Sequence, residues 1–294
     1  MKPRVVICAS GNLGFTTLLK LQNDFVICGI ITDVNSKDII DWAVLNNKAY
    51  FKGNPRKNKL FFKNNIFPAF DFLLSINYLY IIDNDLITLP KKMAINIHGG
   101  LLPRYRGRAP HIWAIINGES ECGITVHKID EGCDTGDIII QKTIPILPNY
   151  TGGELLKIFE SEYPFLIFKA VELVENGHKL IMQDHSIASY FPKRTPEDGE
   201  IDWNWSNERI NNWVRALTKP YPGAFSLLND IKFFIWKVEF FPYPDDDLIK
   251  PGQVKKCNDT ILVKTGNGII KIIDYSFEGE FLDKINNFKG KKNE

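Results

Sequence analysis

Apolar residues in the first 80 positions recur as short continuous runs, and amphipathic stretches separate them. The runs are rich in β-branched residues, which is typical of strands buried on both faces of a sheet. The expected strands are VVICA (5–9), FVICGIIT (25–32), AYF (49–51) and FDFLLSI (70–76). The expected helices cover 15–22, 36–46 and about 57–66. This alternation predicts a parallel sheet with right-handed crossovers, that is, an α/β fold with a Rossmann-like core.

The second half of the chain changes pattern. Residues 151–177 have helical spacing, and residues 185–203 are rich in proline, lysine and acids, as expected of a linker. The helix SNERINNWVRAL is followed by short strands between Gly, Asn and Asp turns, which indicates a small β-barrel. We therefore predict a catalytic-type domain over 1–190, a linker over 191–204 and a small β-domain over 205–294.

Composition narrows the class of protein without deciding its function. The 36 basic residues nearly cancel the 35 acidic ones, leaving a formal net charge of +1. This balance argues against a protein that coats nucleic acid, although a local basic patch remains compatible with it. The 5 cysteines form no CxxC pair, and no run approaches the roughly 20 apolar residues that span a bilayer. We therefore expect a soluble, cytoplasmic protein with reduced thiols.

Candidate chemistry is concentrated between positions 96 and 137. The apolar run MAINI leads into Asn96 and His98, which would point to the same face of a strand. Asp134 follows a Gly/Cys turn and precedes the apolar segment DIIIQKTIPI, so it is expected on a loop beside the sheet. An amide and an imidazole aimed at one point can stabilise an oxyanion, while the acid orients the ring. A satisfied structural histidine is the simpler alternative.

These residues carry a family resemblance. The run N-I-H-G-G-L-L-P-R-Y-R-G, with D-T-G-D-I beginning 36 residues after His98, resembles the formyltransferases that use 10-formyltetrahydrofolate. The family pattern is Asn-x-His, Ser-Leu-Leu-Pro and a distant Asp. The resemblance implies that Asn96, His98 and Asp134 are the catalytic residues, that the C-terminal domain is OB-like and that no metal is needed. This chain departs from the pattern at Gly100, where serine is usual.

The resemblance also implies two walls for the pterin ring of the folate. One would be formed by Leu79, Tyr80 and Ile82, although Leu79 and Ile82 also suit a plain core role. The other would be formed by Asp130, Glu131, Gly132 and Cys133. Cys133 is a poor candidate for a nucleophile, because a small buried filler in the turn is the simpler role.

Acceptor contacts are expected in two places. The turn SGNLG lies between the first strand and the first helix, so Ser10, Gly11 and Asn12 could offer amides to a ligand or simply form a tight turn. Arg104, Tyr105 and Arg106 follow the Leu-Leu-Pro turn and suit a phosphate-bearing acceptor, because arginine binds phosphate oxygens in a bidentate manner. The resemblance also implies that Arg106 and Gly107 help to fix the loop, so not every arginine here is assigned to the substrate.

Within the family, two features favour the sugar-nucleotide enzymes. One is the sequence GRAPHIWAIINGE, and the other is the absence of a basic insertion after the second strand. The expected acceptor is a nucleotide-linked amino sugar, such as dTDP-4-amino-4,6-dideoxyglucose, used for surface polysaccharide such as the lipopolysaccharide O-antigen. Related sugar enzymes are commonly dimers, so a homodimer is also expected. Two alternatives stay open: methionyl-tRNA formylation, and a folate- or nucleotide-binding module without turnover.

Overall fold

A computed structural model of the chain describes residues 1–57, 66–228, 231–242, 244, 249–257, 260–277 and 288. The chain divides into two compact units. The first comprises Met1–Pro110, Cys122–Ile144 and Lys157–Phe191. The second comprises His111–Glu121, Pro145–Leu156 and Pro192–Glu294, so two short inner segments join the C-terminal part. The units are therefore not simply consecutive along the chain, and the boundaries expected at 190 and 204 stay a prediction.

The main sheet belongs to the first unit and has the order β3-β2-β1-β4-β5-β7-β8 within the described residues. Its strands are β1 (Arg4–Ala9), β2 (Val26–Thr32), β3 (Tyr50–Lys52), β4 (Phe72–Ile76), β5 (Met93–His98), β7 (Glu121–Lys128) and β8 (Ile138–Pro145). Strands β3 to β5 pair in parallel in this order, whereas β7 runs antiparallel to β5. The parallel part confirms the predicted Rossmann-like core, and it brings the carboxyl ends of β1, β4 and β5 to one edge.

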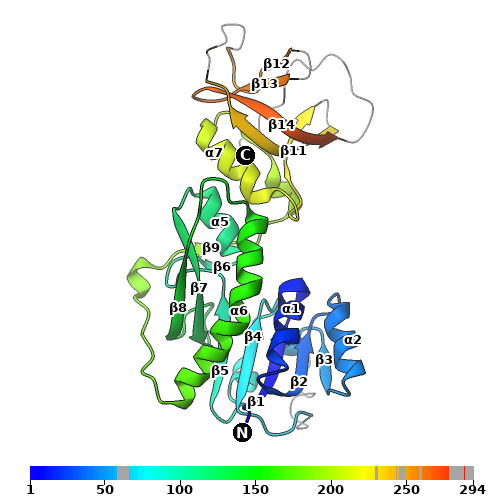
Figure 1. Cartoon of the computed structure of the whole chain (residues 1–294), viewed down its shortest axis with the longest axis vertical. Coiled ribbons are helices and arrows are strands. Elements are labelled where there is room, and N and C mark those ends of the chain that lie inside the picture. The colour runs from blue at the N-terminus through cyan, green and yellow to red at the C-terminus, as the bar shows by residue number, and fades with distance from the viewer. Residues whose placement is uncertain are drawn as a thin grey trace. The chain divides into compact units, whose positions relative to one another are not determined.

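Both faces of this sheet are covered, which explains the continuous apolar runs. On one face, Val6, Cys8 and Leu73 pack with Phe67 and Leu86 in a buried cluster. Helix α1 (Gly11–Leu21) packs on the other face, next to α2 (Lys37–Leu45) and α6 (Gly152–Glu175) (Figure 1). A short helix α4 (Asn84–Ile87) and the two-residue strands β6 (Arg106–Gly107) and β9 (Tyr190–Phe191) complete this part. Single 3₁₀ turns cover Pro55–Lys57, His185–Ile187 and Pro196–Gly199.

The first helix begins earlier than the sequence predicts. SGNLG reads as a turn, but α1 starts at Gly11, directly after an extended Ser10. Gly11 has a φ of +63°, a conformation that glycine adopts without a steric penalty, so strand and helix join within one residue. Most of the helix expected around 57–66 lies outside the described residues.

The second unit contains α5 (Pro110–Ile116), α7 (Asn207–Leu217) and an antiparallel sheet of order β10-β11-β14-β13-β12. Its strands are β10 (Ala224–Leu228), β11 (Ile231–Phe240), β12 (Val254–Cys257), β13 (Thr260–Lys264) and β14 (Ile269–Phe277). The register between β11 and β14 shifts near Lys237, and such bulges curve a sheet. The predicted small β-domain is therefore confirmed as an antiparallel half-barrel. Within the described residues, no helix combines the length and apolarity needed to cross a membrane.

Candidate active site

Asn96 and His98 lie at the carboxyl end of β5, next to the strand whose direction reverses. The alternation of the strand places both side chains on the same face. His98 is buried, with 6% of its surface exposed, although its ring is polar. A buried imidazole has to find hydrogen-bond partners, and those partners define the site.

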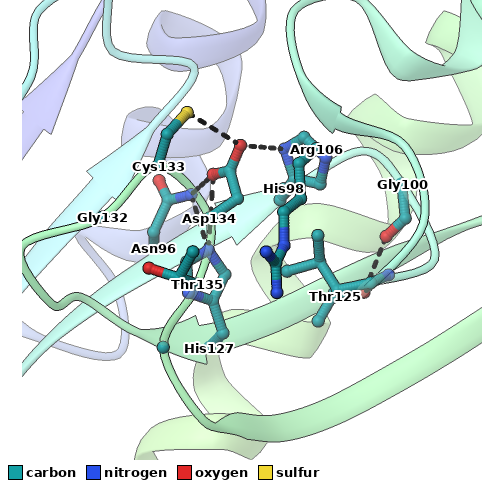
Figure 2. A network of polar contacts seen from close by, with 12 residues as sticks. Asn96, His98, Gly100, Arg106, Thr125, His127, Gly132, Cys133, Asp134 and Thr135 are labelled. Atoms are coloured by element: carbon teal, nitrogen blue, oxygen red, sulfur yellow. Dashed lines mark hydrogen bonds and ion pairs between the residues drawn. The ribbon is translucent and has the colours of Figure 1, made fainter. Parts of the chain in front are cut away.

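Asp134 lies on the loop between β7 and β8 and faces both residues (Figure 2). Its Oδ2 is 3.6 Å from His98 Nδ1, and its Oδ1 is 3.4 Å from Asn96 Nδ2. The backbone N–H of Gly107 donates to Oδ2 at 2.9 Å. Asp134 adopts a left-handed backbone with a φ of 55°, which is uncommon outside glycine and occurs mainly where neighbouring groups hold it. The structure thus brings the three residues of the motif together.

The electrostatics of the site keep Asp134 ionised. Burial on its own raises the pKa of the Asp134 carboxyl, but His98, His127 and the Gly107 amide together outweigh it. The result is a pKa well below the ordinary value of a carboxyl group. Asp134 is therefore a fixed negative charge at neutral pH, suited to stabilise a positive imidazolium.

The hydrogen bonds of His98 fix which nitrogen carries its proton. Nε2 lies 2.7 Å from the carbonyl oxygen of Tyr105, which can only accept, so Nε2–H must donate. Nδ1 then faces the Asp134 carboxylate, and an imidazolium would have both N–H groups paired. Gly100 makes this arrangement fit, because a Cβ there would lie 2.9 Å from His98 Nε2 and 3.0 Å from the Tyr105 oxygen. A serine at position 100 would require one of these groups to shift.

A second histidine, His127 on β7, belongs to the site and was not identified in the sequence. It pairs directly across the antiparallel strands with Asn96, and its Nε2 lies 3.0 Å from Asn96 Nδ2. Nε2 is also 3.6 Å from Asp134 Oδ1, so the carboxylate lies between two imidazoles. Nδ1 donates to the Lys128 carbonyl at 2.8 Å, which leaves Nε2 of a neutral ring to accept from Asn96. The signal in the sequence was a histidine on an apolar strand just before the Asp134 loop.

The residues expected to form the first pterin wall do not share one environment. Leu79 is 44% exposed, whereas Ile82 is buried in the hydrophobic cluster with Leu86. Ile82 thus makes the core contribution that its sequence also allowed. Arg108 donates to the backbone carbonyls of Tyr78 and Leu79, which ties this segment to the loop after β5.

The second expected wall is a tightly bonded turn. Asp130 Oδ1 accepts from the Gly132 amide at 3.0 Å and from the Thr135 hydroxyl at 2.5 Å. Cys133 is exposed, which corrects the expectation of a buried filler. Partial burial of its sulfur and the neighbouring Asp134 carboxylate raise the pKa of this thiol to about 11. Cys133 is therefore protonated at neutral pH and does not act as a thiolate nucleophile.

The residues expected at the turn after β1 already have protein partners. Ser10 is buried, and its carbonyl accepts from Asn77 Nδ2 at 3.0 Å. The Gly11 amide donates to Ser36 Oγ at 2.9 Å, and Asn12 Nδ2 donates to Glu160 Oε1 at 2.9 Å. Their contribution to substrate binding stays a prediction.

The three residues after the Leu-Leu-Pro turn differ strongly in exposure. Arg104 is exposed, as a residue that meets a phosphate should be. Tyr105 is buried, and its ring stacks on Phe191 with centroids 4.7 Å apart. Arg106 is 1% exposed and donates to Gln183, His185 and Tyr190. Arg104 is therefore better placed for an acceptor than the other two.

The polar groups of the site do not form an evident metal centre. Within the described residues, no group of three or more His, Cys, Asp and Glu side chains has an arrangement that could hold a metal ion. The chemistry available is hydrogen bonding from Asn96, acid–base chemistry of the histidines and the fixed charge of Asp134.

Comparison with known proteins gives consistent relatives. A family model described as formyl transferase matches residues 45–171, and one described as formyl transferase, C-terminal domain, matches residues 193–292. A methionyl-tRNA formyltransferase of Ruminiclostridium cellulolyticum is 36% identical over 223 residues, covering 74% of this chain and 70% of the relative. The bifunctional polymyxin resistance protein ArnA of Wigglesworthia glossinidia brevipalpis is 32% identical over 301 residues. That match covers 96% of this chain but 44% of ArnA, so the chain spans less than half the length of that relative.

Solved structures show the same fold at lower identity. An N-formyltransferase from Helicobacter canadensis, in complex with folinic acid and dTDP-3-aminofucose, has a TM-score of 0.69 at 22% identity and covers 94% of this chain and 100% of its own. WlaRD, a sugar 3N-formyl transferase in the presence of dTDP and 5-N-formyl-THF, has a TM-score of 0.68 at 22% identity, covering 96% and 100%. Two family models together match most of the sequence, and the methionyl-tRNA formyltransferase is matched over most of its length. The chain belongs to the formyltransferase family.

Proposed function

We propose that this protein is an N-formyltransferase that moves a formyl group from 10-formyltetrahydrofolate to the amine of a nucleotide-linked amino sugar. The observation that carries the proposal is the convergence of Asn96, His98 and Asp134 at the end of β5, within 3.6 Å of one another through the Asp134 carboxylate. Family membership supplies the reaction type. The folate compounds in the complexes of two structural relatives support the donor.

The proposed reaction begins with attack of the neutral sugar amine on the formyl carbon. A C–N bond forms, and the formyl oxygen becomes an oxyanion that accepts a hydrogen bond from Asn96 Nδ2. The amine nitrogen then loses a proton to Nδ1 of neutral His98, and the imidazolium so formed gives that proton to N10 of the folate as the C–N10 bond breaks. The products are the sugar formamide and tetrahydrofolate, and the residues return to their starting state.

Asp134 contributes to this sequence as a permanent charge. Its depressed pKa keeps it ionised when His98 takes up the amine proton, so the charge of the imidazolium is balanced within the site. His127 helps to orient Asn96, because its Nε2 accepts one amide proton and so fixes the plane of the carboxamide. The second amide proton, near Asp134 Oδ1 in the absence of substrate, is the one offered to the oxyanion.

The sugar acceptor is supported by charge and by the structural relatives. The near-neutral chain offers little attraction to a long polyanion, since phosphate contacts dominate nucleic-acid affinity. The complexes of WlaRD and the Helicobacter enzyme contain dTDP or a dTDP-amino sugar. We assign Arg104 to the diphosphate, because its side chain is exposed beside the buried Tyr105. A role in surface polysaccharide, such as the O-antigen, and a homodimeric enzyme belong to the same proposal and rest on the family resemblance.

Methionyl-tRNA formylation is the second candidate, and one observation favours it. The tRNA enzyme of Ruminiclostridium cellulolyticum is 36% identical to this chain over 223 residues. Sequence similarity alone therefore does not separate the two acceptors, and the acceptor assay has to.

The deciding experiment supplies purified protein and 10-formyltetrahydrofolate with dTDP-4-amino-4,6-dideoxyglucose, with the UDP-linked sugar, or with methionyl initiator tRNA. Formation of tetrahydrofolate is followed, and a His98→Ala variant gives the background. Turnover with a sugar alone supports the proposal, and turnover with the tRNA alone replaces it by the second candidate. Folate binding without transfer to any amine would show a binding module instead.

A further inference from the structure

Gln183 is a buried polar residue near the site, and no motif in the sequence singled it out. Its side chain is 4% exposed and uses both ends of the carboxamide. Nε2 donates to the backbone carbonyls of Asp134 and Gly136, at 2.9 and 2.7 Å. Oε1 accepts from the guanidinium of Arg106, at 3.2 and 2.6 Å. No glutamate or methionine could make this set of contacts, because both lack the amide donor.

Arg106 explains why the acceptor end of Gln183 is fixed. Its guanidinium is buried and forms no salt bridge among the described residues. It donates instead to Gln183, to His185 Nδ1 at 2.9 Å and to the Tyr190 hydroxyl at 2.6 Å. A buried charge is tolerated only when its donors are satisfied, so these contacts hold one another rigidly.

The two residues close a ring of contacts around Asp134. The backbone amide after Arg106, that of Gly107, donates to the Asp134 carboxylate at 2.9 Å. Gln183, bound to the Arg106 side chain, holds the Asp134 carbonyl. Asp134 is therefore held at its carboxylate by Gly107 and at its backbone carbonyl by Gln183, which is itself bound to the Arg106 side chain. These two hydrogen bonds account for the left-handed backbone of Asp134, a residue that is not glycine.

We propose that Gln183, held by the buried Arg106 guanidinium, is a positioning residue for formyl transfer that fixes the Asp134 carboxylate opposite His98. The inference rests on the proposed function, because positioning has meaning only for the reaction. Arg106 accordingly acts through the protein and not through a bound phosphate. Tyr190 supports the same ring of contacts. Its hydroxyl accepts from Arg106, and its ring centroid lies 5.3 Å from the Arg106 Cζ.

Two substitutions separate positioning from simple structural support. Gln183→Met is neutral and similar in length, and it removes both the donor and the acceptor. Gln183→Glu restores an acceptor for Arg106 but not the donor to Asp134. We expect kcat to fall about 10-fold or more in both variants, as for other residues that orient a functional group through hydrogen bonds. KM for both substrates should stay within about 3-fold of the wild-type value. Thermal stability should fall in Gln183→Met and should be closer to that of the wild type in Gln183→Glu, because the glutamate keeps an acceptor for Arg106.

A readout independent of turnover is the hydrogen exchange of the Gly107 amide, followed by NMR. This amide donates to the Asp134 carboxylate, so it should exchange faster in both variants if Asp134 loses its orientation. Gln141→Met is the control for the loss of one amide donor, because Gln141 is more exposed but its Nε2 also donates to a backbone carbonyl, that of Leu102, at 2.7 Å. The control should lower stability without changing exchange at Gly107.

Three outcomes would overturn the inference: kcat within about 3-fold of wild type in Gln183→Met, recovery of kcat together with stability in Gln183→Glu, or unchanged exchange at Gly107. If Gln183→Met does not fold, Gln183→Glu carries the test alone, because it keeps Arg106 paired. A wild-type protein that formylates no amine would refute the proposed function instead. The Gly107 exchange would still decide whether Gln183 holds Asp134.

Discussion

The two units of the chain bury different kinds of residue. The first unit buries titratable groups, among them His98, Arg106 and His127, each at most 6% exposed. Within the described part of the second unit, the buried polar residues are Ser226 and Thr265. Its interior consists otherwise of apolar and aromatic side chains. The first unit thus has more fully buried ionisable groups, and the desolvation cost of such groups is characteristic of sites that perform chemistry.

Arginine shows the same difference. Arg106 in the first unit has its donors occupied by Gln183, His185 and Tyr190. In the second unit, the guanidinium of Arg194 lies 4.4 Å from the ring centroid of Trp213 and 4.9 Å from that of Trp113. Stacking on indoles leaves the cation partly solvated and demands less exact partners. The comparison predicts that substitutions in the first unit act on rate, and those in the second on stability.

The largest expected effect on rate is at Asp134. Asp134→Asn removes the charge that balances His98 but keeps the shape of the side chain, so kcat should fall about 10²- to 10⁴-fold, and stability at neutral pH should fall by about 2 kcal/mol. Steady-state kinetics and thermal unfolding measure both. Asp71→Asn is the matched control, because it makes the same charge change just before β4, at the opposite end of that strand. Near-normal turnover in Asp134→Asn would remove the residue from the mechanism.

The largest expected effect on stability is at Trp203 in the second unit. Its ring is fully buried and stacks on Phe288, and its Nε1 donates to Ser226 Oγ at 2.9 Å. Trp203→Ala should destabilise the unit by about 3–5 kcal/mol. Denaturant unfolding measures this, with Trp236→Ala as control. Trp236 donates similarly to Ser276 but is only half-buried, so an equal loss in the control would contradict the assignment of Trp203 to the core.

The third prediction concerns acid. Because the pKa of Asp134 is lower in the folded protein than in the unfolded chain, its ionised form contributes stability above the ordinary carboxyl pKa of about 4. That contribution, about 2 kcal/mol, is lost as the pH falls from about 5 towards 2. Unfolding free energies across this range should have a steeper slope in the wild type than in Asp134→Asn. Parallel slopes would show that Asp134 has no depressed pKa.

The smallest effect is expected at His127. His127→Gln keeps an acceptor near Asn96, whereas His127→Asn is too short to provide one, so kcat should fall about 10-fold in the asparagine variant and less in the glutamine variant. The pair of variants is its own control, since both remove the titratable ring. If the glutamine variant is as slow as the asparagine variant, the hydrogen-bond acceptor of His127 does not account for its effect on the rate.

Local sequence was sufficient for several parts of this structure. Continuous runs of apolar, β-branched residues predicted β1, β2 and β4. The segment that begins at Ser206 predicted α7, and the Ser206 side chain caps this helix by accepting from the Arg209 amide. Asn96 and His98 could be placed on one face because alternation along a strand is a local property. The start of α1 was missed because a glycine with positive φ can begin a helix directly after a strand.

The family motif identified Asn96, His98 and Asp134 as belonging together, but the groups that hold them come from distant segments. His127 reaches Asn96 through antiparallel pairing, and Gln183 reaches Asp134 across 49 residues of sequence. Likewise, Arg104 and Arg106 lie two residues apart in the sequence, yet one is exposed and the other is among the most buried side chains. Sequence alone determined the class of elements and the chemical groups of the site. The tertiary structure decided their hydrogen-bond partners and burial, because these depend on non-local strand pairing and packing.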